Sequence, residues 1–534
     1  MKKPTIQTVW NFERHRNIAL FSLLFLATVL IRLPYFFPSV IAWDESTFIL
    51  MGQSILDGYL PYTQLWDQKA PLAFLPFALF IAVFGDGVIG IRIGGALFVL
   101  AAAYLTYRIG HSIWDRRTGL LAAIISIVFI SFSEGGQSTM TEILACVPGL
   151  GALAVALRGI ANPRSAFLIG FLLSLAILVR LNLAYLALAV GALVFAQSLV
   201  QHHGMKPFLM YTLGGFIPVG IIFALYFTSG HLAILIQSLI EAPLEYSTSQ
   251  FSMMEALGAH LEYVFQSWSA LLWIGFLGGV AVSSVAWRNY QEPKKLKLVV
   301  IATFFFGIAL SIIRSGAAWP HYLIQLIPLM SLLAGYFYAS LLSIRHKGFG
   351  ILILTLILAG LIPPAKPLFY EYLRLGRKLA NHQPLMSDTG YKLAEYLRNE
   401  NPQREPMYLM NYHIAHWLTG TKPLSKLITH PSNIAKPSLL KVVAGPDAST
   451  AGEIEKLFLK QPLFVVKAEE VKYLRNKPEA NAVVDEKLRL HYTLVQIVDR
   501  RAYVYKRNPS SPRQGLQRPQ QPALSEVHQD ERRR

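Results

Sequence analysis

Long runs of hydrophobic residues, separated by short polar stretches, dominate the first two thirds of the chain. A helix needs about 20 mainly apolar residues to span a bilayer. Eleven runs come close to this length: 18–37, 88–108, 118–133, 143–160, 165–180, 182–200, 208–228, 264–287, 297–313, 322–343 and 348–364. A twelfth run, 71–84, is shorter and contains Pro76. The pattern predicts an α-helical polytopic membrane protein with about 11 transmembrane helices, or roughly 12–13 if further runs cross.

The basic residues decide whether 71–84 crosses the membrane. If it does not, the loops richest in Lys and Arg share one side with the N-terminus: Arg108–Arg117, Arg158–Arg164, Arg288–Lys297 and Arg345–Lys347. The positive-inside rule assigns that side to the cytoplasm. We therefore expect 71–84 to be an interfacial helix of a protein in the cytoplasmic (inner or plasma) membrane. The N-terminus would be cytoplasmic, and the chain after Pro364 would be extracytoplasmic.

Beyond residue 365 the hydrophobic pattern changes from long runs to short segments. Residues 391–397 have helical spacing, and four segments are typical of strands: 406–410, 462–466, 492–498 and 502–505. The last residues are rich in Pro, Gln, Ser and Arg, which is typical of disorder. We expect a transmembrane domain at 1–365 with its first external loop at 38–87, a small extracytoplasmic α/β domain at 366–507, and a disordered tail at 508–534.

Composition agrees with a membrane protein. The chain is 53% hydrophobic and only 15% charged, whereas an average soluble domain carries about 25% charged residues. The net charge of +18 does not argue for a nucleic-acid partner, because Lys and Arg orient the loops of membrane proteins and meet anionic headgroups. We expect the lipid bilayer, and no nucleic acid, as a partner. The single cysteine, Cys146, lies in an apolar run and is interpreted as a packing residue.

The first external loop holds a cluster of charges, which are costly beside a bilayer. Asp44 and Glu45 follow the first run closely, and Asp67 and Lys69 lie at the end of the loop. A positioned carboxylate can take the proton of an attacking sugar hydroxyl as a general base, and an adjacent carboxylate can bind the acceptor. Alternatively, Asp44 caps a helix that runs through Thr47. Lys69 can bind a phosphate at headgroup depth, or its amine simply snorkels to the interface.

Further polar residues lie at the predicted external ends of later spans. Glu142 is a substrate contact or a hydrogen-bonded helix end. Arg314 and His321 could neutralise a phosphate leaving group, and Tyr322 and Gln325 would share a helix face with His321. The alternative for this segment is an aromatic belt that anchors the helix at the interface. Snorkelling explains each of three arginines near the same ends: Arg32, Arg92 and Arg180.

Motifs for several other chemistries are missing from the sequence. It contains no P-loop, no Gly-rich dinucleotide fingerprint and no Cys/His spacing typical of a metal site. The pair Asp44-Glu45 could hold a divalent cation, but two adjacent acids indicate this only weakly. No cofactor and no metal site is therefore indicated.

The order of the motifs resembles a known superfamily. A first span is followed by Asp44-Glu45, then by Gly58-Tyr59-Leu60-Pro61-Tyr62, by Asp67-Gln68-Lys69-Ala70-Pro71, and later by His-Tyr-x-x-Gln-x-x-Pro at 321–328. This order is similar to that of the GT-C membrane glycosyltransferases. Within them it is most similar to the dolichyl-phosphate-mannose protein mannosyltransferase and aminoarabinose transferase group, glycosyltransferase families 39 and 83. Gln68 departs from the Glu of the aminoarabinose transferases, which weakens a specific aminoarabinose activity.

The resemblance implies a fold and a reaction. The fold would be a GT-C bundle, and the donor would be a sugar on a polyprenyl monophosphate. The sugar would pass, with inversion, to a hydroxyl of a cell-envelope lipid, polysaccharide or protein. Asp44 would be the general base, Glu45 would contact the acceptor, and Lys69 would lie near the donor phosphate. The remaining candidates are Arg314 and His321 at the phosphate, and Glu142, Asp67, Tyr62, Tyr322 and Gln325 as substrate contacts.

Two other functions have to be weighed against a transferase. A transporter or flippase of lipid-linked sugars predicts ionisable residues near the middle of the membrane and discontinuous helices, whereas the charges here gather at external ends. A polymerase or ligase of surface polysaccharide has a different loop organisation. If the transferase hypothesis is right, Asp44, Lys69, Glu142 and His321 must converge on one site.

Overall fold

The computed structural model describes residues 6–200, 204–249, 254–255, 257–258, 261–262, 269–315, 319–344 and 347–509. The predicted disordered tail, 508–534, therefore lies outside the described residues from residue 510 onward.

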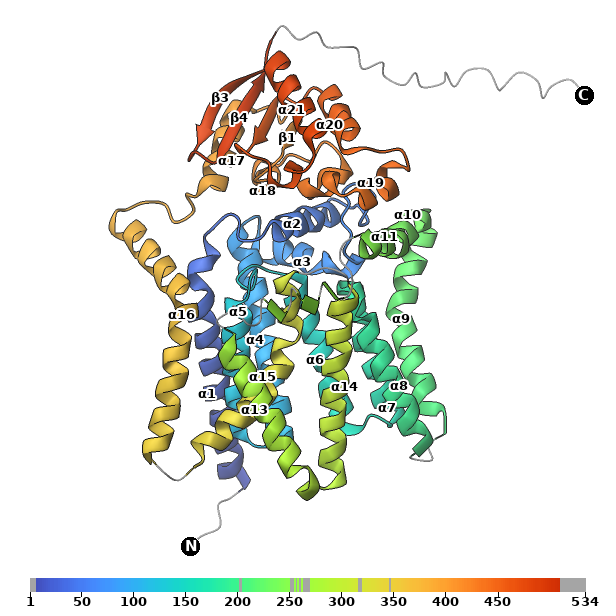
Figure 1. The fold of residues 1–534 in the computed structure, drawn as a ribbon, viewed down its shortest axis with the longest axis vertical. Coiled ribbons are helices and arrows are strands. Elements are labelled where there is room, and N and C mark those ends of the chain that lie inside the picture. Colours follow the sequence, from blue (N-terminus) through green and yellow to red (C-terminus); the bar gives the residue numbers. More distant parts are fainter. Residues whose placement is uncertain are drawn as a thin grey trace, which may run out of the picture.

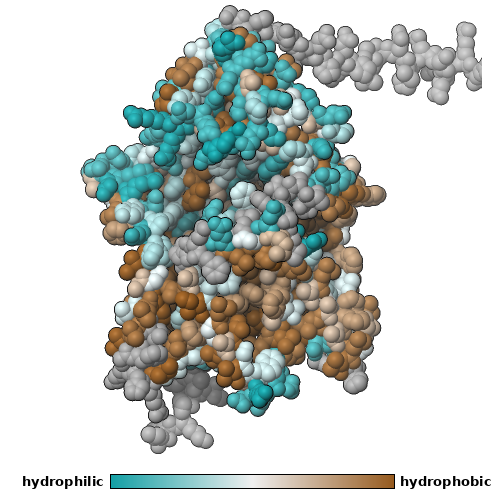
Figure 2. All heavy atoms as spheres, viewed as in Figure 1, coloured by the Kyte–Doolittle hydropathy of each residue, from teal (hydrophilic) through white to brown (hydrophobic). Residues whose placement is uncertain are grey.

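A bundle of long helices forms one half of the molecule (Figure 1). In the described part of the chain, eleven helices have 16 or more residues, and each overlaps one of the predicted apolar runs: α1 (Ile6–Arg32), α4 (Val88–Ile113), α5 (Arg116–Phe132), α6 (Thr141–Gly159), α7 (Pro163–Val179), α8 (Ala184–Val200), α9 (Lys206–Thr228), α13 (Ala270–Ala286), α14 (Glu292–Arg314), α15 (Ile327–Leu342) and α16 (Lys347–Ala380). Seven of the described helices are long and apolar enough to cross a membrane. Figure 2 shows hydrophobic atoms over this half and hydrophilic atoms over the other.

Two helices lie across the top of the bundle instead of along it: α2 (Trp43–Leu56) and α3 (Leu75–Phe84), the latter preceded by the short helix η2 (Pro71–Ala73) (Figure 1). The two helices cross closely, since a Cβ atom on Gly52 would lie 2.7 Å from Cβ of Phe77. On α3, Phe77 is buried while Leu79 and Val83 are exposed. An apolar helix that lies flat with one apolar side exposed fits the interfacial helix predicted for 71–84.

Short helices connect the long ones: η1 (Leu33–Phe36), η3 (Leu181–Leu183), α10 (Leu232–Ile236), the π-helical turn η4 (Gln237–Glu241), α11 (Ala242–Ser249), η5 (Trp287–Asn289) and η6 (Pro320–Gln325). The last of these differs from the sequence prediction. Residues 322–326 were expected to begin an α-helix, but η6 is a 3₁₀ helix and α15 starts only at Ile327. Pro320 and Pro328 lie at the first turns of the two helices, where proline is tolerated because its missing N–H has no intrahelical partner there.

The C-terminal part is a small α/β domain, as predicted. Its sheet has the strand order β1-β2-β4-β3, with β1 (Met407–Leu409) parallel to β2 (Phe464–Lys467), and with β4 (Ala502–Arg507) antiparallel to both β2 and β3 (Tyr492–Val498). Around the sheet lie α17 (Thr389–Glu400), α18 (Ile414–Thr419), η7 (Lys426–Ile428), η8 (Pro431–Ala435), α19 (Pro437–Ala444), α20 (Thr450–Leu459), η9 (Lys472–Leu474) and α21 (Pro478–His491).

The strands β1 and β2 are covered on both faces of the sheet, whereas β3 is largely exposed. Tyr408 and Val465 belong to one buried cluster, and Met407 and Phe464 belong to another. Because successive residues of a strand point to opposite faces, the continuous hydrophobic segments of β1 and β2 identify strands that are buried on both sides. The helix α16 continues through the domain boundary expected at residue 365 and ends at Ala380.

The C-terminal domain is seated on α2 (Figure 1). Ile414 and Leu439 of the domain are buried in the same hydrophobic core as the bundle. Polar contacts accompany them: the backbone N–H of Ser39 donates to Asp388 Oδ2 at 2.7 Å, and Trp417 Nε1 donates to Gln53 Oε1 at 3.3 Å. The domain thus covers the loop 38–87 and helps to hold its residues in place.

Substitution of Gly214 by alanine tests the closest helix crossing of the bundle. A Cβ atom at Gly214 of α9 would lie 2.0 Å from the carbonyl oxygen of Phe167 on α7, so the two helices must move apart. We expect Gly214→Ala to destabilise the detergent-solubilised protein by about 1–3 kcal/mol, the usual effect of overpacking, as measured by a lower midpoint of thermal unfolding. Gly220→Ala in the same helix is the control, because nothing lies within 4 Å of its Cβ position. Equal midpoints for the two variants would contradict the prediction.

Candidate active site

Asp44 lies in the first turn of α2 and not at its cap. The N-cap residue is Ala42, which makes no side-chain hydrogen bond, so the alternative that Asp44 merely caps the helix is wrong. A carboxylate in the first turn interacts favourably with the positive end of the helix dipole. The Asp44 side chain is 31% exposed, and its Oδ1 lies 3.3 Å from Nε2 of His430.

The surroundings of Asp44 keep its carboxylate ionised. Burial alone would raise the pKa of Asp44, but the hydrogen bond from His430 and the nearby charges of Lys69 and His321 hold that pKa well below its ordinary value. Opposite charges and hydrogen bonds to the charged form both favour ionisation. At neutral pH the carboxylate can therefore accept a proton or bind a hydroxyl group.

Glu45, the neighbour of Asp44, is held by partners inside the protein. Its carboxylate accepts from Nε of Arg92 at 2.7 Å, lies 2.5 Å from Nη2 of the same arginine, and accepts from the backbone N–H of Thr139 at 2.5 Å. Glu45 is only 1% exposed. These contacts join α2 to α4 and to the loop before α6. The contact of Glu45 with an acceptor stays a prediction.

Three arginines that were explained by snorkelling are in fact buried. Arg32 and Arg92 are 0% exposed and Arg180 is 5% exposed. Arg32 donates to the carbonyl oxygens of Gly136 at 2.6 Å and Gln137 at 3.0 Å. Arg180 pairs with Glu142 and donates to Thr141 Oγ1 at 3.0 Å. The sequence signal for this was the presence of Glu45 and Glu142 near the same helix ends, because buried charges need partners.

Lys69 is positioned by two other predicted residues. The hydroxyl of Tyr62 donates to the Lys69 carbonyl at 2.6 Å, and the Lys69 N–H donates to Asp67 Oδ1 at 3.1 Å. Tyr62 and Asp67 are both buried. Burial alone would lower the pKa of the Lys69 amine, but Tyr322, Asp44 and Asp67 hold it above its ordinary value. Lys69 therefore carries its positive charge at neutral pH.

Lys69 lines a cavity of about 340 Å³ that we call the Lys69 cavity. Arg180, Arg314 and Tyr322 also line it, together with many apolar residues: Ala70, Val179, Leu181, Leu239, Ile240, Pro243 and Leu244. Within the described part of the chain, no carboxylate lies within ion-pair distance of Lys69 or Arg314. The cavity therefore combines available positive charge with an apolar wall, which suits an anionic group on an apolar chain.

The other predicted residues lie around this cavity or just behind it. Glu142 is fully buried, and its Oε1 lies 3.6 Å from Nε2 of His321. The guanidinium of Arg180 lies 4.4 Å from the ring centroid of Tyr322. Gln325 points elsewhere: it lines a separate cavity of about 20 Å³ beside Cys146. In the 3₁₀ helix η6, residues three apart lie on one face, so His321 does not share a face with Gln325, four residues further on.

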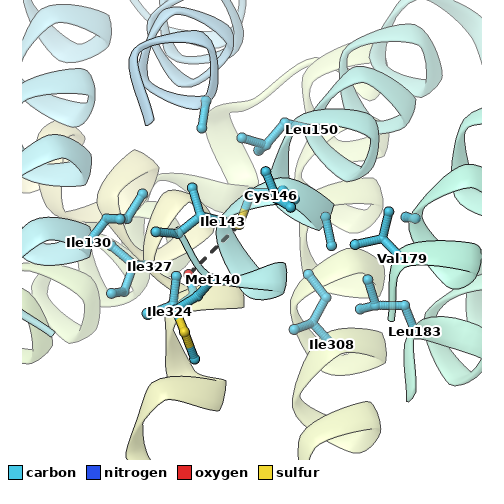
Figure 3. Close-up of a cluster of buried hydrophobic side chains, with 14 of the residues drawn as sticks. Ile130, Met140, Ile143, Cys146, Leu150, Val179, Leu183, Ile308, Ile324 and Ile327 are labelled. Carbon is cyan, nitrogen blue, oxygen red and sulfur yellow. Dashed lines mark hydrogen bonds between the residues drawn. The ribbon is translucent and has the colours of Figure 1, made fainter. Parts of the chain in front are cut away.

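A cluster of buried hydrophobic side chains lies between the helices of the bundle (Figure 3). Ile143, Cys146 and Leu150 of α6 pack there with residues of the neighbouring helices: Val179, Leu183, Ile308, Ile324 and Ile327. The Sγ atom of Cys146 lies 3.9 Å from the carbonyl oxygen of Ile324. Cys146 is buried in this cluster, as expected for a packing residue.

Sequence reasoning missed the contribution of the C-terminal domain. His430 contacts Asp44, and Nε2 of His413 lies 3.0 Å from Oγ1 of Thr47 on α2. The rings of both histidines pack against Trp43, with centroids 5.8 and 6.0 Å away. Nothing near these histidines in the sequence signals the contact, because His413 is 366 residues away from Thr47 along the chain and His430 follows later still.

A second cavity, of about 810 Å³, lies between the domain and the bundle. We call it the Trp43 cavity, because Trp43, the neighbour of Asp44, is part of its wall. Asn411, which is 6% exposed, also lines it, and its Oδ1 has no hydrogen-bond partner in the described part of the chain. Trp43 in the first turn of α2 thus lines the Trp43 cavity, and the carboxylate of Asp44 beside it interacts with the charge of Lys69. Among the described residues no group of three or more His, Cys, Asp or Glu side chains could hold a metal ion.

Comparisons with known proteins agree with this architecture. The family model described as dolichyl-phosphate-mannose-protein mannosyltransferase matches residues 68–226, which include Lys69, Glu142 and Arg180. No curated protein sequence matches the chain.

Solved structures extend the likeness to almost the whole chain. ArnT from Cupriavidus metallidurans bound to undecaprenyl phosphate is 16% identical, with a TM-score of 0.55 over 92% of this chain and 98% of that one. The apo state of the same protein is 14% identical over the same shares, also with a TM-score of 0.55. The archaeal oligosaccharyltransferase AglB from Archaeoglobus fulgidus, in complex with an inhibitory peptide and a dolichol-phosphate, is 12% identical over 94% of this chain and 75% of that one, with a TM-score of 0.48.

The predicted resemblance to the ArnT-like GT-C glycosyltransferases is therefore confirmed. At this identity the ArnT structures show a shared fold. The chain is a multi-pass membrane protein of that fold with a small C-terminal α/β domain.

Replacement of Arg92 tests the buried pair behind Asp44. Arg92→Met leaves the Glu45 carboxylate without its main partner, and breaking a buried pair in this way costs about 3–5 kcal/mol. We expect a large drop in the thermal unfolding midpoint of the purified protein. The double variant Glu45→Gln/Arg92→Met should recover part of the loss, because it removes the unpaired charge. A double variant as unstable as Arg92→Met alone would show that the charge is not the cause.

Proposed function

We propose that this protein is a membrane glycosyltransferase that moves a sugar from a polyprenyl-phosphate-linked donor to a hydroxyl of an extracytoplasmic acceptor. Asp44 is the general base, and the anomeric centre is inverted. The observation that carries this proposal is the position of the Asp44 carboxylate between two cavity-lining residues. Asp44 interacts electrostatically with Lys69, which lines one cavity, and its neighbour Trp43 lines the other. The family match and the shared fold support a glycosyltransferase over other classes.

The donor binds in the Lys69 cavity. Its phosphate is held by Lys69 and Arg314, and Arg180 adds charge from the wall. The polyprenyl chain lies along the apolar residues of the same cavity. The chain therefore does not need to leave the membrane environment. The ArnT structure that shares the fold was solved with undecaprenyl phosphate, which is a lipid phosphate of this class. His321 is not among the residues that line this cavity; its Nε2 lies 3.6 Å from Oε1 of Glu142.

The acceptor approaches from the Trp43 cavity. The volume of about 810 Å³ lies within the range of about 300–1,000 Å³ that is typical of ligand pockets. Trp43 offers an aromatic face, and the unpartnered Oδ1 of Asn411 suits a hydroxyl donor. Glu45 does not need to contact the acceptor in this arrangement. It fixes the first turn of α2 through Arg92 and thereby holds Asp44 in place.

The reaction then needs no cofactor. As the acceptor oxygen attacks the anomeric carbon, its proton passes to Asp44. The bond from the anomeric carbon to the phosphate oxygen breaks, and its electron pair stays on the phosphate. Lys69 and Arg314 stabilise the charge that develops there. Attack and departure occur on opposite faces of the sugar, which inverts the centre. The C-terminal domain is extracytoplasmic, as the basic loops of the other side predict.

Replacement of Asp44 tests the proposed base. Asp44→Asn keeps the size of the side chain but cannot take a proton, so we expect transfer to be lost while the protein still inserts in the membrane. Cells that lack the gene are complemented with each variant, and their surface glycans and glycoproteins are compared by mass spectrometry. Asp57→Asn, which changes an acid at the far end of α2 that pairs with Lys422, should complement like the wild type. Normal glycans with Asp44→Asn would refute the proposal.

Replacement of Lys69 tests the donor site without knowledge of the sugar. We expect Lys69→Met to weaken binding of undecaprenyl phosphate by about tenfold or more, since a hydrogen bond to a charged group contributes about 1.5–3 kcal/mol. Native mass spectrometry or a fluorescence titration in detergent measures this. A polyprenol without the phosphate should bind both proteins equally. Lys472→Met, which removes a lysine of the Trp43 cavity, is the control and should bind like the wild type.

A further inference from the structure

The C-terminal domain contributes a side chain to the first turn of α2. His430 precedes η8, and its Nε2 lies 3.3 Å from Oδ1 of Asp44. The Asp44 side chain is 31% exposed and that of His430 is 12% exposed, so the contact lies at the edge of a site and not in a core. The two residues come from opposite ends of the chain, and only the docked domain brings them together.

The other nitrogen of the His430 ring determines which tautomer faces Asp44. The backbone N–H of Ser432 donates to Nδ1 at 3.3 Å, and Oγ of Ser432 lies 2.8 Å from the same atom. A ring nitrogen that accepts a hydrogen bond carries no proton. In the neutral imidazole the proton therefore sits on Nε2 and is directed toward the Asp44 carboxylate.

The segment that carries His430 is fixed on both sides of the site. Thr429 Oγ1 accepts from the backbone N–H of Trp66 at 3.1 Å, in the stretch that leads to Lys69. The ring of His430 packs on Trp43 with centroids 6.0 Å apart. His430 thus has little freedom relative to either Asp44 or the Lys69 stretch.

We propose that His430 is a positioning residue of the active site, whose Nε2–H holds Oδ1 of Asp44 so that Oδ2 is the oxygen that takes the acceptor proton. The inference rests on the proposed function, in which Asp44 is the base. His430 itself neither gains nor loses a proton. The acceptor O–H proton goes to Oδ2 of Asp44 and leaves from there to solvent or to the released phosphate monoester. The soluble domain is therefore part of the catalytic machinery and not only a cover.

The charges around Asp44 define what loss of this contact does. The titratable groups that face its carboxylate are Lys69 from the first loop, His321 from η6, and His430 and His413 from the domain. Burial lowers the pKa of His413 well below its ordinary value, so His413 stays neutral. A hydrogen bond to the ionised form lowers the pKa of a carboxyl group. Removal of the His430 donor must therefore raise the pKa of Asp44.

Two substitutions at His430 separate the hydrogen bond from the packing. His430→Phe keeps a ring against Trp43 but removes the N–H. His430→Gln restores a donor, because its amide nitrogen is three bonds from Cβ, as Nε2 is in histidine. The measurement is an infrared pH titration of the full-length protein in detergent, which follows the carbonyl band of the protonated carboxyl group. The band that is missing in Asp44→Asn is that of Asp44, and the method needs no substrate.

We expect the midpoint pH of the Asp44 titration to be about one unit higher in His430→Phe than in the wild type. In His430→Gln the midpoint should lie much closer to the wild-type value. Glycan transfer in the complemented cells should fall about tenfold in His430→Phe and recover in His430→Gln. His413→Gln is the matched control. It changes the neighbouring histidine, which contacts Thr47 and not Asp44, and should leave the titration of Asp44 in place. The thermal unfolding midpoint of each variant shows whether the domain stays folded.

Each contrary outcome has a distinct meaning. An unchanged Asp44 titration in His430→Phe overturns the inference, and so does a His430→Gln variant that behaves like His430→Phe. An equal shift in His413→Gln assigns the effect to docking of the domain and overturns the role of His430. If the His430 variants behave as expected but Asp44→Asn transfers sugar normally, the proposed base fails while the contact itself stands.

Discussion

Charge that is buried between the helix bundle and the C-terminal domain needs a partner, and this constraint organises the layer where the two meet. An unpaired buried charge costs several kcal/mol, so the two most deeply buried glutamates of this layer are each matched with an arginine. Glu45 is held by Arg92, and Glu142 is held by Arg180. These pairs lock α2, α4, α6 and the start of η3 to one another. They form a rigid frame in a region that consists mostly of loops and helix ends.

Two charged residues beside this frame, Asp44 and Lys69, do not take part in its ion pairs. Asp44 is partly exposed beside Trp43, and Lys69 faces a cavity with an apolar wall. In the proposed function these are the carboxylate that takes the acceptor proton and the ammonium that binds the donor phosphate. In that proposal the two substrates, one lipid-like and one polar, bind in two separate cavities.

The C-terminal domain adds the third element of this arrangement. It covers α2 and places His430 and His413 against the turn that carries Asp44. Neighbouring hydrogen bonds and charges decide whether Asp44 stays ionised in this partly buried position. In the proposed function the membrane part therefore acts together with this domain, whose two hydrophobic clusters lie on the faces of its own sheet.

The sequence by itself determined the helices, the flat helix α3, the four strands and the charged loop with Asp44 and Lys69. Long apolar runs, continuously apolar strands and charges beside a bilayer are each compatible with few structures. Each of these patterns can be recognised from residues that are neighbours in the sequence. Only the tertiary structure decided which charged residues form buried ion pairs. It buried Arg32, Arg92 and Arg180, turned Gln325 away from the Lys69 cavity, and brought His430 to Asp44. Such contacts join segments that are far apart along the chain, and no local pattern records them.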